Sequence, residues 1–327
     1  FLVDMRADLL RFLEKDPALR SLDRELEARL GAWFDVGFLE LHRISWNSPA
    51  ILLEKLIEYE AVHEIRSWSD LKNRLDSDRR CYAFFHPRMP MEPLIFVEVA
   101  LVEELADNVQ ALLDEHAPVF DAQRAKTAIF YSISNTQTGL RGVSFGNFLL
   151  KRVVEDLKRD FPRLTTFATL SPIPTLRRWV DKNPDIWAQA FGGDMVERVA
   201  RQVGSKGPVV QSIDDIRKLL ADDAWVGNAR LARVLQPGLT RLAARYFLNA
   251  KSGDRPYDPV SRFHLGNGAR IERINYLADT SPNGLKQSFG LMVNYLYDPD
   301  AIEANVEAFS REGIVATSGA VRRAARD

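Results

Sequence analysis

The chain between Thr127 and Pro174 reads TAIFYSIS (127–134), QTGLRGVSFG (137–146), NFLLKRVVEDLKRDF (147–161) and LTTFATLSPIP (164–174). Short apolar runs rich in β-branched and aromatic residues favour strands, and the longer amphipathic segment favours a helix. A loop of backbone N–H groups that opens a helix is a ready site for an anion. The second strand ends at a hydroxyl, Ser171. The stretch therefore predicts a βαβ unit suited to a phosphate-bearing ligand and a reactive side chain.

Taken from the residues alone, each candidate in this region keeps two interpretations. The loop lacks the G-x-G-x-x-G and G-x-x-x-x-G-K-[S/T] patterns of nucleotide-binding folds, so its glycines fit a phosphate loop or a plain turn equally well. Ser171 ends a strand, where open sheets bind ligands, but a turn-forming serine before proline is the commoner case. No G-x-S-x-G motif surrounds it. His264 can exchange protons near neutral pH, although a lone histidine is more often structural. For Tyr297 the default interpretation is packing.

Composition excludes several classes of protein. The 327 residues are 46% hydrophobic and 27% charged, which is typical of a globular protein, and a net charge of -1 gives no electrostatic case for nucleic acid or an anionic membrane as partner. Cys81 is the single cysteine, so no intramolecular disulfide can form, and the histidines show no ligand-spaced pair. No apolar run is long enough to span a bilayer, and no signal-peptide pattern is present. We therefore expect no metal, no membrane span and a cytoplasmic location.

The remaining pattern predicts a mixed α+β protein. We expect helices over residues 1–36, broken at Asp16-Pro17, and over residues 50–76. Strands are expected at 81–85, 94–102, 269–277 and 289–297. Residues 176–250 are expected to be mostly helical, with a loop at 203–212 and a break at Pro237. The order of helices, strands, βαβ unit, helices and strands favours a partly antiparallel sheet.

Several long segments of the chain, in order, resemble the malonyl-CoA decarboxylase family. These are WF (33–34), GFLELHRISW (37–46), RRCY (79–82), AIFYSIS (128–134), QTGLRG (137–142), FLLKR (148–152), LSPIP (170–174), FHLGNGA (263–269), INYLAD (274–279) and GLMVNY (290–295). The resemblance implies an acetyltransferase-like (GNAT-type) mixed sheet flanked by helices. It also implies that residues 1–36 are the end of a helical oligomerisation domain, that residues 37–327 form the catalytic acyl-CoA-binding domain, and that the protein is a homo-oligomer, either a tetramer or a dimer of dimers.

The resemblance assigns roles to particular residues. Its catalytic serine falls on Ser171, its catalytic histidine on His264 and a supporting tyrosine on Tyr297. The acyl-CoA-binding positions fall on Gln137, Gly139, Arg141, Gly142, Val143, Ser144, Phe145, Gly146 and Asn147. Ser144 stands where some relatives carry an acidic residue, which leaves the role of that side chain open.

The implied reaction turns malonyl-CoA into acetyl-CoA and CO2, in fatty acid metabolism. It needs no cofactor, because the thioester carbonyl can take the electrons left at C2 as an enolate. Donors in the Gly142 loop would stabilise the enolate oxygen, and His264 would deliver the proton to C2. Ser171 would bond the malonyl carboxylate or thioester and pass its proton to the relay; which of the two residues touches C2 is a hypothesis. Two alternatives stay open: an acyl-CoA-dependent acyltransferase, and a non-catalytic acyl-CoA sensor. A serine hydrolase is disfavoured, since no acidic partner for His264 is identifiable.

Overall fold

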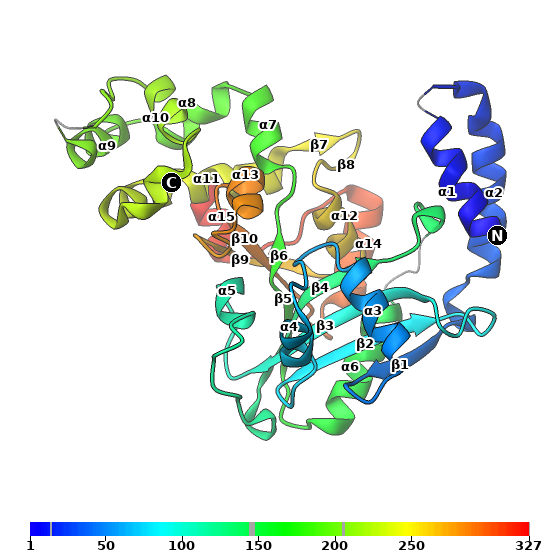
Figure 1. Ribbon diagram of the computed structural model, residues 1–327. Helices are drawn as coiled ribbons and strands as arrows, with labels where there is room; N and C mark the ends of the chain where they lie inside the picture. Colours follow the sequence, from blue (N-terminus) through cyan, green and yellow to red (C-terminus); the bar gives the residue numbers. More distant parts are fainter. Residues whose placement is uncertain (14, 144–147, 205–206, 327) are drawn as a thin grey trace. The chain divides into compact units, whose positions relative to one another are not determined.

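The structure is a computed structural model and describes residues 1–13, 15–143, 148–204 and 207–326. The chain forms two compact units (Figure 1). Unit 1 comprises Phe1–Leu105 and Leu113–Phe167, and unit 2 comprises Ala106–Leu112 and Ala168–Asp327.

Unit 1 contains the predicted N-terminal helices and the first strands. Its helices are α1 (Leu2–Phe12), α2 (Arg20–Trp33), α3 (Ala50–Tyr59), α4 (Trp68–Arg74) and α6 (Phe148–Asp160), with 3-10 turns η1 (Pro17–Leu19), η2 (Val36–Phe38), η3 (Ala122–Arg124) and η4 (Thr138–Leu140). Its strands are β1 (Glu40–Ile44), β2 (Arg79–Phe85), β3 (Pro93–Val102), β4 (Thr127–Asn135) and the start of β5 (Thr166–Thr169). The predicted break at Asp16-Pro17 is confirmed: the Asp16 carboxylate accepts a hydrogen bond from Ala18 N–H and caps η1.

Strands β2, β3 and β4 of unit 1 are buried on both faces, whereas β1 is mostly exposed. β1, β2, β3 and β4 pair antiparallel in that order. Along β2, Cys81 and Ala83 join the apolar core beneath α3 and α4, whereas Tyr82 donates a hydrogen bond to Asp156 of α6. Side chains of a strand alternate between its faces, so α6 and the α3–α4 pair cover opposite faces of the sheet.

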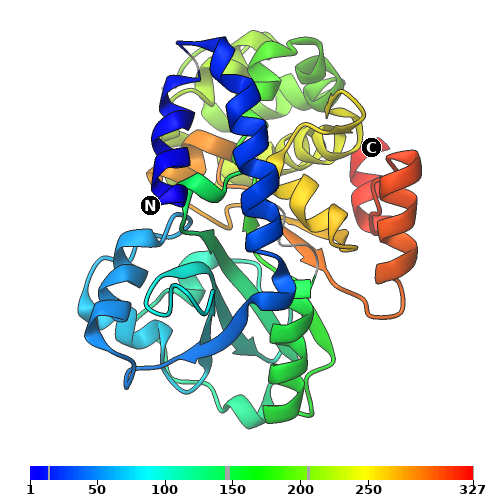
Figure 2. The same ribbon diagram turned by 90° about the vertical axis from the view of Figure 1, so that its right-hand side faces the viewer.

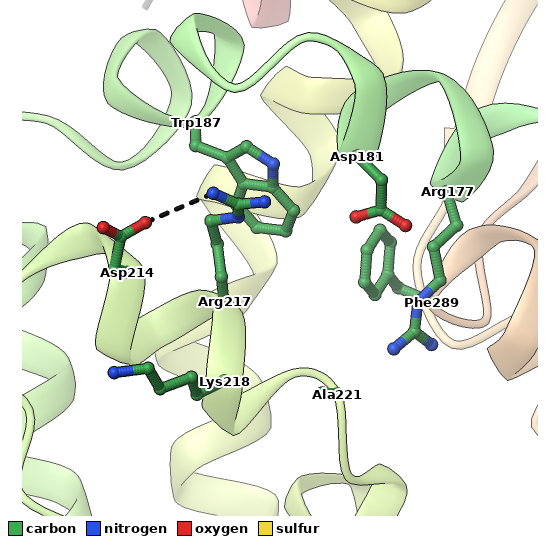
Figure 3. Close-up of a pocket in the computed structure, with 8 residues that line it drawn as sticks. All are labelled: Arg177, Asp181, Trp187, Asp214, Arg217, Lys218, Ala221 and Phe289. Carbon is green, nitrogen blue, oxygen red and sulfur yellow. Dashed lines mark hydrogen bonds and ion pairs between the residues drawn. The ribbon is translucent and has the colours of Figure 1, made fainter.

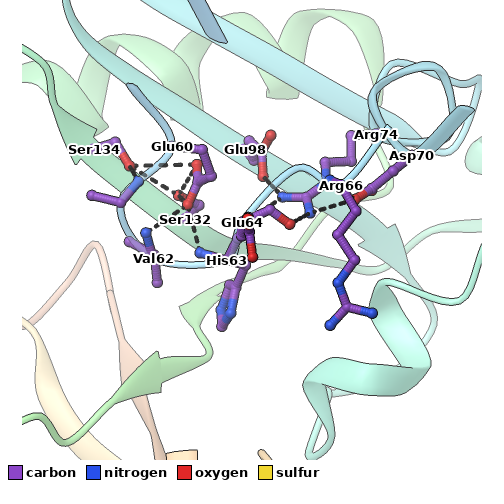
Figure 4. Close-up of polar contacts among 11 residues, drawn as sticks. Glu60, Val62, His63, Glu64, Arg66, Asp70, Arg74, Glu98, Ser132 and Ser134 are labelled. Carbon is purple, nitrogen blue, oxygen red and sulfur yellow. Dashed lines mark hydrogen bonds and ion pairs between the residues drawn. The ribbon is translucent and has the colours of Figure 1, made fainter. Parts of the chain in front are cut away.

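A buried ionic cluster ties α4 and the preceding segment to the sheet (Figure 4). Arg74 is 2% exposed and donates to both carboxylate oxygens of Asp70, at 2.7 and 3.1 Å, and to Glu98 of β3 at 3.1 Å. Burial raises the pKa of Glu98 to about 8 although the Arg74 guanidinium beside it acts in the opposite direction. Nearby, Glu60 accepts hydrogen bonds from the Ser132 hydroxyl, and burial raises its pKa as well. These bonds satisfy groups that would be costly to bury alone.

Unit 2 is mainly helical. Its helices are α5 (Val109–Leu112), α7 (Leu176–Lys182), α8 (Asp185–Phe191), α9 (Met195–Val203), α10 (Ile213–Leu219), α11 (Ala229–Asn249), α12 (Pro259–Gly266), α13 (Pro282–Ser288), α14 (Ile302–Glu312) and α15 (Gly319–Arg326), with the 3-10 turn η5 (Asp223–Gly227). Its strands are the end of β5, β6 (Ser171–Pro172), β7 (Lys251–Ser252), β8 (Arg255–Pro256), β9 (Arg270–Asn275) and β10 (Met292–Leu296). β10 is the central strand and pairs antiparallel with β5, β6 and β9.

The predicted break at Pro237 is wrong, because α11 continues through that residue. A proline inside a helix removes one hydrogen bond and costs about 3 kcal/mol. On both sides of it, buried leucines such as Leu235 and Leu239 hold the helix, and each buried leucine contributes roughly 1.5–3 kcal/mol. Gly238 lets the helix approach Phe191 so closely that a Cβ there would lie 2.3 Å from the ring. Packing therefore outweighs the local cost of the proline.

The last predicted strand begins later than expected. Phe289 has φ +56° and Gly290 φ +77°, a left-handed pair that ends α13 before β10 starts at Met292. β9 is likewise shorter than the predicted 269–277. The predicted fold class is confirmed: an α+β protein with a mixed sheet flanked by helices and an N-terminal helical segment. Within the described ranges, no helix is both long and apolar enough to cross a bilayer.

Candidate active site

Three predicted catalytic residues meet in the interior of unit 2. The Ser171 Oγ lies 3.3 Å from Nε2 of His264, and Nδ1 of the same ring lies 2.7 Å from the Tyr297 hydroxyl. All three residues are buried, at 5%, 3% and 6% exposure. The imidazole is thus held between two hydroxyl groups.

Strand β10 positions two of these three residues, Ser171 and Tyr297. Val293 pairs with Ser171, and Tyr297 directly follows the last residue of the strand. Asn294, also in β10, donates to the Thr169 carbonyl at 2.8 Å and accepts from the Asn275 amide at 2.8 Å. This fully buried amide fixes the end of β5, two residues before the serine, since breaking a buried hydrogen bond leaves a costly unpaired group.

Helix α12 delivers the histidine. The Asp258 carboxylate caps its N-terminus by accepting a hydrogen bond from Ser261 N–H at 2.9 Å, and Pro259 occupies the first turn. Both residue types are favoured at these positions of a helix. His264 lies in the last turn and stacks on the Tyr295 ring at 4.4 Å between centroids. Gly268 ends the turn with φ +83°, where a Cβ would lie 2.6 Å from the Ile302 carbonyl oxygen. Sequence analysis did not predict this helix.

Burial controls the protonation of these groups. It lowers the pKa of His264 to about 3 and raises the pKa of Tyr297 above its usual range. Among the described residues, the groups that bond to the His264 ring nitrogens are hydroxyls and not carboxylates. The imidazole is therefore neutral at physiological pH, with one N–H donor and one acceptor nitrogen.

The neutral chain can be hydrogen-bonded in two directions. In one, the Tyr297 O–H donates to Nδ1, the Nε2–H of His264 donates to Ser171, and Ser171 donates to the Thr169 hydroxyl, which lies 2.8 Å away. In the other, Nδ1–H donates to Tyr297 and Ser171 donates to Nε2. Conversion between the two moves one proton along the chain without creating a buried imidazolium.

Thr169 was missed at the sequence level. Its hydroxyl accepts from Ser171 and also from the Tyr295 N–H at 3.2 Å. The available signal was spacing, because residues two apart in an extended strand point to the same face. Asn294 was missed too, although an amide in an otherwise apolar strand is uncommon and signals a specific partner.

The predicted acyl-CoA-binding positions lie in unit 1, where Gln137, Gly139, Arg141, Gly142 and Val143 are described. Four of these, all but Gly139, line a pocket of about 270 Å³ together with Leu94, Asn135, Thr138 and Leu140. The turn is closed by hydrogen bonds from Leu140, Arg141 and Val143 N–H to carbonyls three residues earlier. Ser144, Phe145, Gly146 and Asn147 lie outside the described residues.

Unit 2 contains a larger pocket, of about 420 Å³, that includes none of the predicted site residues (Figure 3). Its lining consists of Arg177, Asp181, Trp187, Asp214, Arg217, Lys218, Ala221 and Phe289. The Arg177 guanidinium stacks over Phe289, and that of Arg217 lies over Trp187 and bonds to Asp214. Most of the cationic side chains of this pocket are thus paired with carboxylates or aromatic rings that also line it.

The fold and the hydroxyl–imidazole–hydroxyl chain define an α+β protein with a buried candidate acid–base site. Comparison with known proteins identifies the family. The model of the malonyl-CoA decarboxylase C-terminal domain matches residues 37–327, and that of the malonyl-CoA decarboxylase N-terminal domain matches residues 1–34. The chain belongs to the malonyl-CoA decarboxylase family.

Named relatives agree with this. The chain is 39% identical to the mitochondrial malonyl-CoA decarboxylase of Anser anser anser over 94% of its length and 40% identical to that of Rattus norvegicus over 91%. It spans 63% and 62% of those proteins. Solved malonyl-CoA decarboxylases from Rhodopseudomonas palustris and Agrobacterium vitis superpose with a TM-score of 0.86 each, at 47% and 46% identity, covering 98% and 99% of this chain and 75% of theirs.

Proposed function

We propose that this chain converts malonyl-CoA to acetyl-CoA and CO2. Family membership supports the reaction, and the observation that carries the assignment is the buried Ser171–His264–Tyr297 chain. Such a chain can deliver a proton to carbon without forming a buried imidazolium.

The chemistry makes two demands on the protein. Loss of CO2 leaves an electron pair that moves into the thioester carbonyl and forms an enolate. Hydrogen-bond donors must stabilise the enolate oxygen, and one such donor can contribute roughly 3 kcal/mol to catalysis. A proton from the protein then adds to C2, and solvent replaces it, so that each turnover consumes one proton.

We assign the proton delivery to Ser171, with His264 and Tyr297 behind it. The serine hydroxyl gives its proton to C2 and takes one from the Nε2–H of His264, while Nδ1 takes the proton of the Tyr297 hydroxyl. The resulting Tyr297 phenolate regains a proton from solvent and completes the turnover. Each transfer between the three residues follows a hydrogen bond of the folded protein, at 3.3 and 2.7 Å. A neutral imidazole suits this role because it accepts and donates at the same time.

We assign the nucleotide part of the substrate to the turn around Gly142. Backbone N–H groups hold phosphate oxygens well, and glycines let the anion approach. Gln137, Arg141 and Val143 line the same 270 Å³ pocket as Gly142, which supports a binding role for these positions.

The wider assignments are part of the same proposal. Residues 1–36 would be the end of a helical oligomerisation domain and residues 37–327 the catalytic domain, in keeping with the family matches at 1–34 and 37–327. We further propose a tetramer or dimer of dimers, a cytoplasmic enzyme of fatty acid metabolism, and a reaction without cofactor, metal or nucleic acid.

Incubation of the purified chain with malonyl-CoA, with CO2 and acetyl-CoA followed together, tests the activity. Equal amounts of both products are expected. An acyl-CoA-dependent acyltransferase would release CoA only when an acceptor amine is supplied, and a sensor would retain malonyl-CoA unchanged; either result would overturn the proposal.

A further inference from the structure

Arg6 of helix α1 is a fully buried cation in unit 1. Only 1% of its surface is exposed, although the helix is otherwise amphipathic. Its Nε donates to Asp23 at 2.8 Å and its Nη2 to Glu27 at 2.9 Å, both in α2. The third nitrogen, Nη1, donates to the carbonyl oxygens of Gly139 at 2.9 Å and Arg141 at 2.7 Å. One side chain therefore joins the N-terminal helix pair to the η4 turn.

Helices α1 and α2 pack closely against the turn at residues 138–142 (Figure 2), and two glycines of the turn show how close the contact is. A Cβ on Gly139 would lie 1.8 Å from the Val3 carbonyl oxygen, and a Cβ on Gly142 would lie 2.6 Å from the Glu27 carboxylate. Gly142 also has φ +90°, a conformation that other residues adopt only with strain. The turn is built to fit against α1 and α2.

The orientation of one peptide group follows from the Arg6 contact. A trans peptide is planar, and its C=O and N–H point in opposite directions. The Arg141 carbonyl points at Arg6, so the N–H of Gly142, which shares that peptide, points away from Arg6. The N–H groups of Leu140, Arg141 and Val143 are used within the turn. Gly142 N–H has no acceptor among residues 1–13, 15–143, 148–204 and 207–326.

We propose that Arg6 is a positioning residue that holds the Gly142 N–H outward as a donor for an anionic oxygen of the acyl-CoA substrate. The inference rests on the proposed function, because the anion is the one that a CoA ester carries. Arg6 touches no substrate atom in this scheme. It fixes the direction of a donor that does, and the binding energy of the nucleotide part depends on that direction.

The test compares Arg6→Met with Arg11→Met. Both side chains lie on α1, but Arg11 is 78% exposed, and its one partner among the described residues is Asp8 of the same helix. For Arg6→Met we expect KM for malonyl-CoA and the Kd for CoA, measured by calorimetry, to rise about tenfold. Arg11→Met should leave both at the wild-type values.

A conservative variant separates positioning from support of the fold. Arg6→Lys keeps the positive charge that Asp23 and Glu27 require, but an ammonium lacks the planar fork that serves two carboxylates and two carbonyls at once. KM should fall between those of the wild type and Arg6→Met, with the melting temperature near that of the wild type. If Arg6→Met yields no folded protein, the KM and Kd of Arg6→Lys alone test the inference.

The outcomes are distinct. Unchanged KM and Kd in a folded Arg6 variant would overturn the inference while wild-type turnover upholds the proposed function. A wild-type chain that neither binds CoA nor releases CO2 would instead overturn the proposed function.

Discussion

Replacing His264 with asparagine should remove an acid sensitivity from the folded protein. Burial lowers the pKa of this histidine to about 3, whereas an unfolded histidine titrates near pH 6.5. The unfolded chain therefore binds the proton more readily, and acid favours unfolding. The stability that depends on a neutral His264 is complete above about pH 6.5 and is lost as the pH falls from there toward about pH 3.

The magnitude follows from the difference between the two pKa values. Each pH unit inside this window costs about 1.4 kcal/mol, so that about pH 5, roughly 1.5 units below the unfolded pKa, corresponds to about 2 kcal/mol. We expect the free energy of unfolding of the wild type to fall by about 2 kcal/mol more than that of His264→Asn between about pH 7 and about pH 5. Other titrating groups affect both proteins equally and cancel in the comparison.

Urea unfolding followed by circular dichroism at several pH values measures this difference. His116→Asn is the matched control, because His116 is exposed and its loss should leave the wild-type pH dependence in place. Parallel pH profiles for the wild type and His264→Asn would refute the reasoning, since they would show that His264 titrates alike in the folded and unfolded chains.

Three further predictions concern the site and the core. Ser171→Ala should lower kcat for decarboxylation about 100-fold with little change in KM; full turnover in a stopped assay of acetyl-CoA would contradict the relay. Tyr297→Phe, which removes the hydroxyl from His264 Nδ1, should lower kcat about tenfold in the same assay and leave folding unchanged by circular dichroism; an unaltered kcat would remove Tyr297 from the relay. Arg74→Met leaves Asp70 and Glu98 buried without their shared cation and should cost about 3–5 kcal/mol in urea unfolding; a loss below about 1 kcal/mol would mean that the cluster adds little.

Strands β2, β3 and β4 were predictable because they are buried on both faces, whereas the mostly exposed β1 was not predicted. Apart from Arg79, Arg80 and Glu98, β2 and β3 are apolar runs bounded by turn residues, and such runs have few other stable conformations. α12 escaped prediction, although its Asp258-Pro259 start and Asn267-Gly268 end are present in the sequence. A helix of eight residues has little stability of its own, so contacts with the rest of unit 2 decide whether it forms.

Ser171, His264 and Tyr297 of the candidate site were named from the sequence, but its other members, Thr169 and Asn294, and its geometry were not. Ser171 and His264 are 93 residues apart, and no local pattern relates them. The residues alone favoured a turn serine and a structural histidine, and the family resemblance singled them out. Their distance is set by β10, which pairs with β6, and by the packing of α12. No single segment of the sequence predicts this distance, because it depends on contacts between segments that are far apart in the chain.

The nature of the His264 partners bears on the choice between decarboxylase and acyl-transfer chemistry. A serine becomes a strong nucleophile when a histidine accepts its proton and a carboxylate stabilises the resulting imidazolium. Here the second partner of the ring is the neutral hydroxyl of Tyr297, and burial lowers the pKa of His264 to about 3. Full transfer of the Ser171 proton to the ring would therefore be strongly unfavourable. Donation from Ser171 to a basic carbon needs no such charge, because His264 gives one proton as it receives another. The same geometry that makes Ser171 a poor nucleophile makes it a competent proton donor to an enolate.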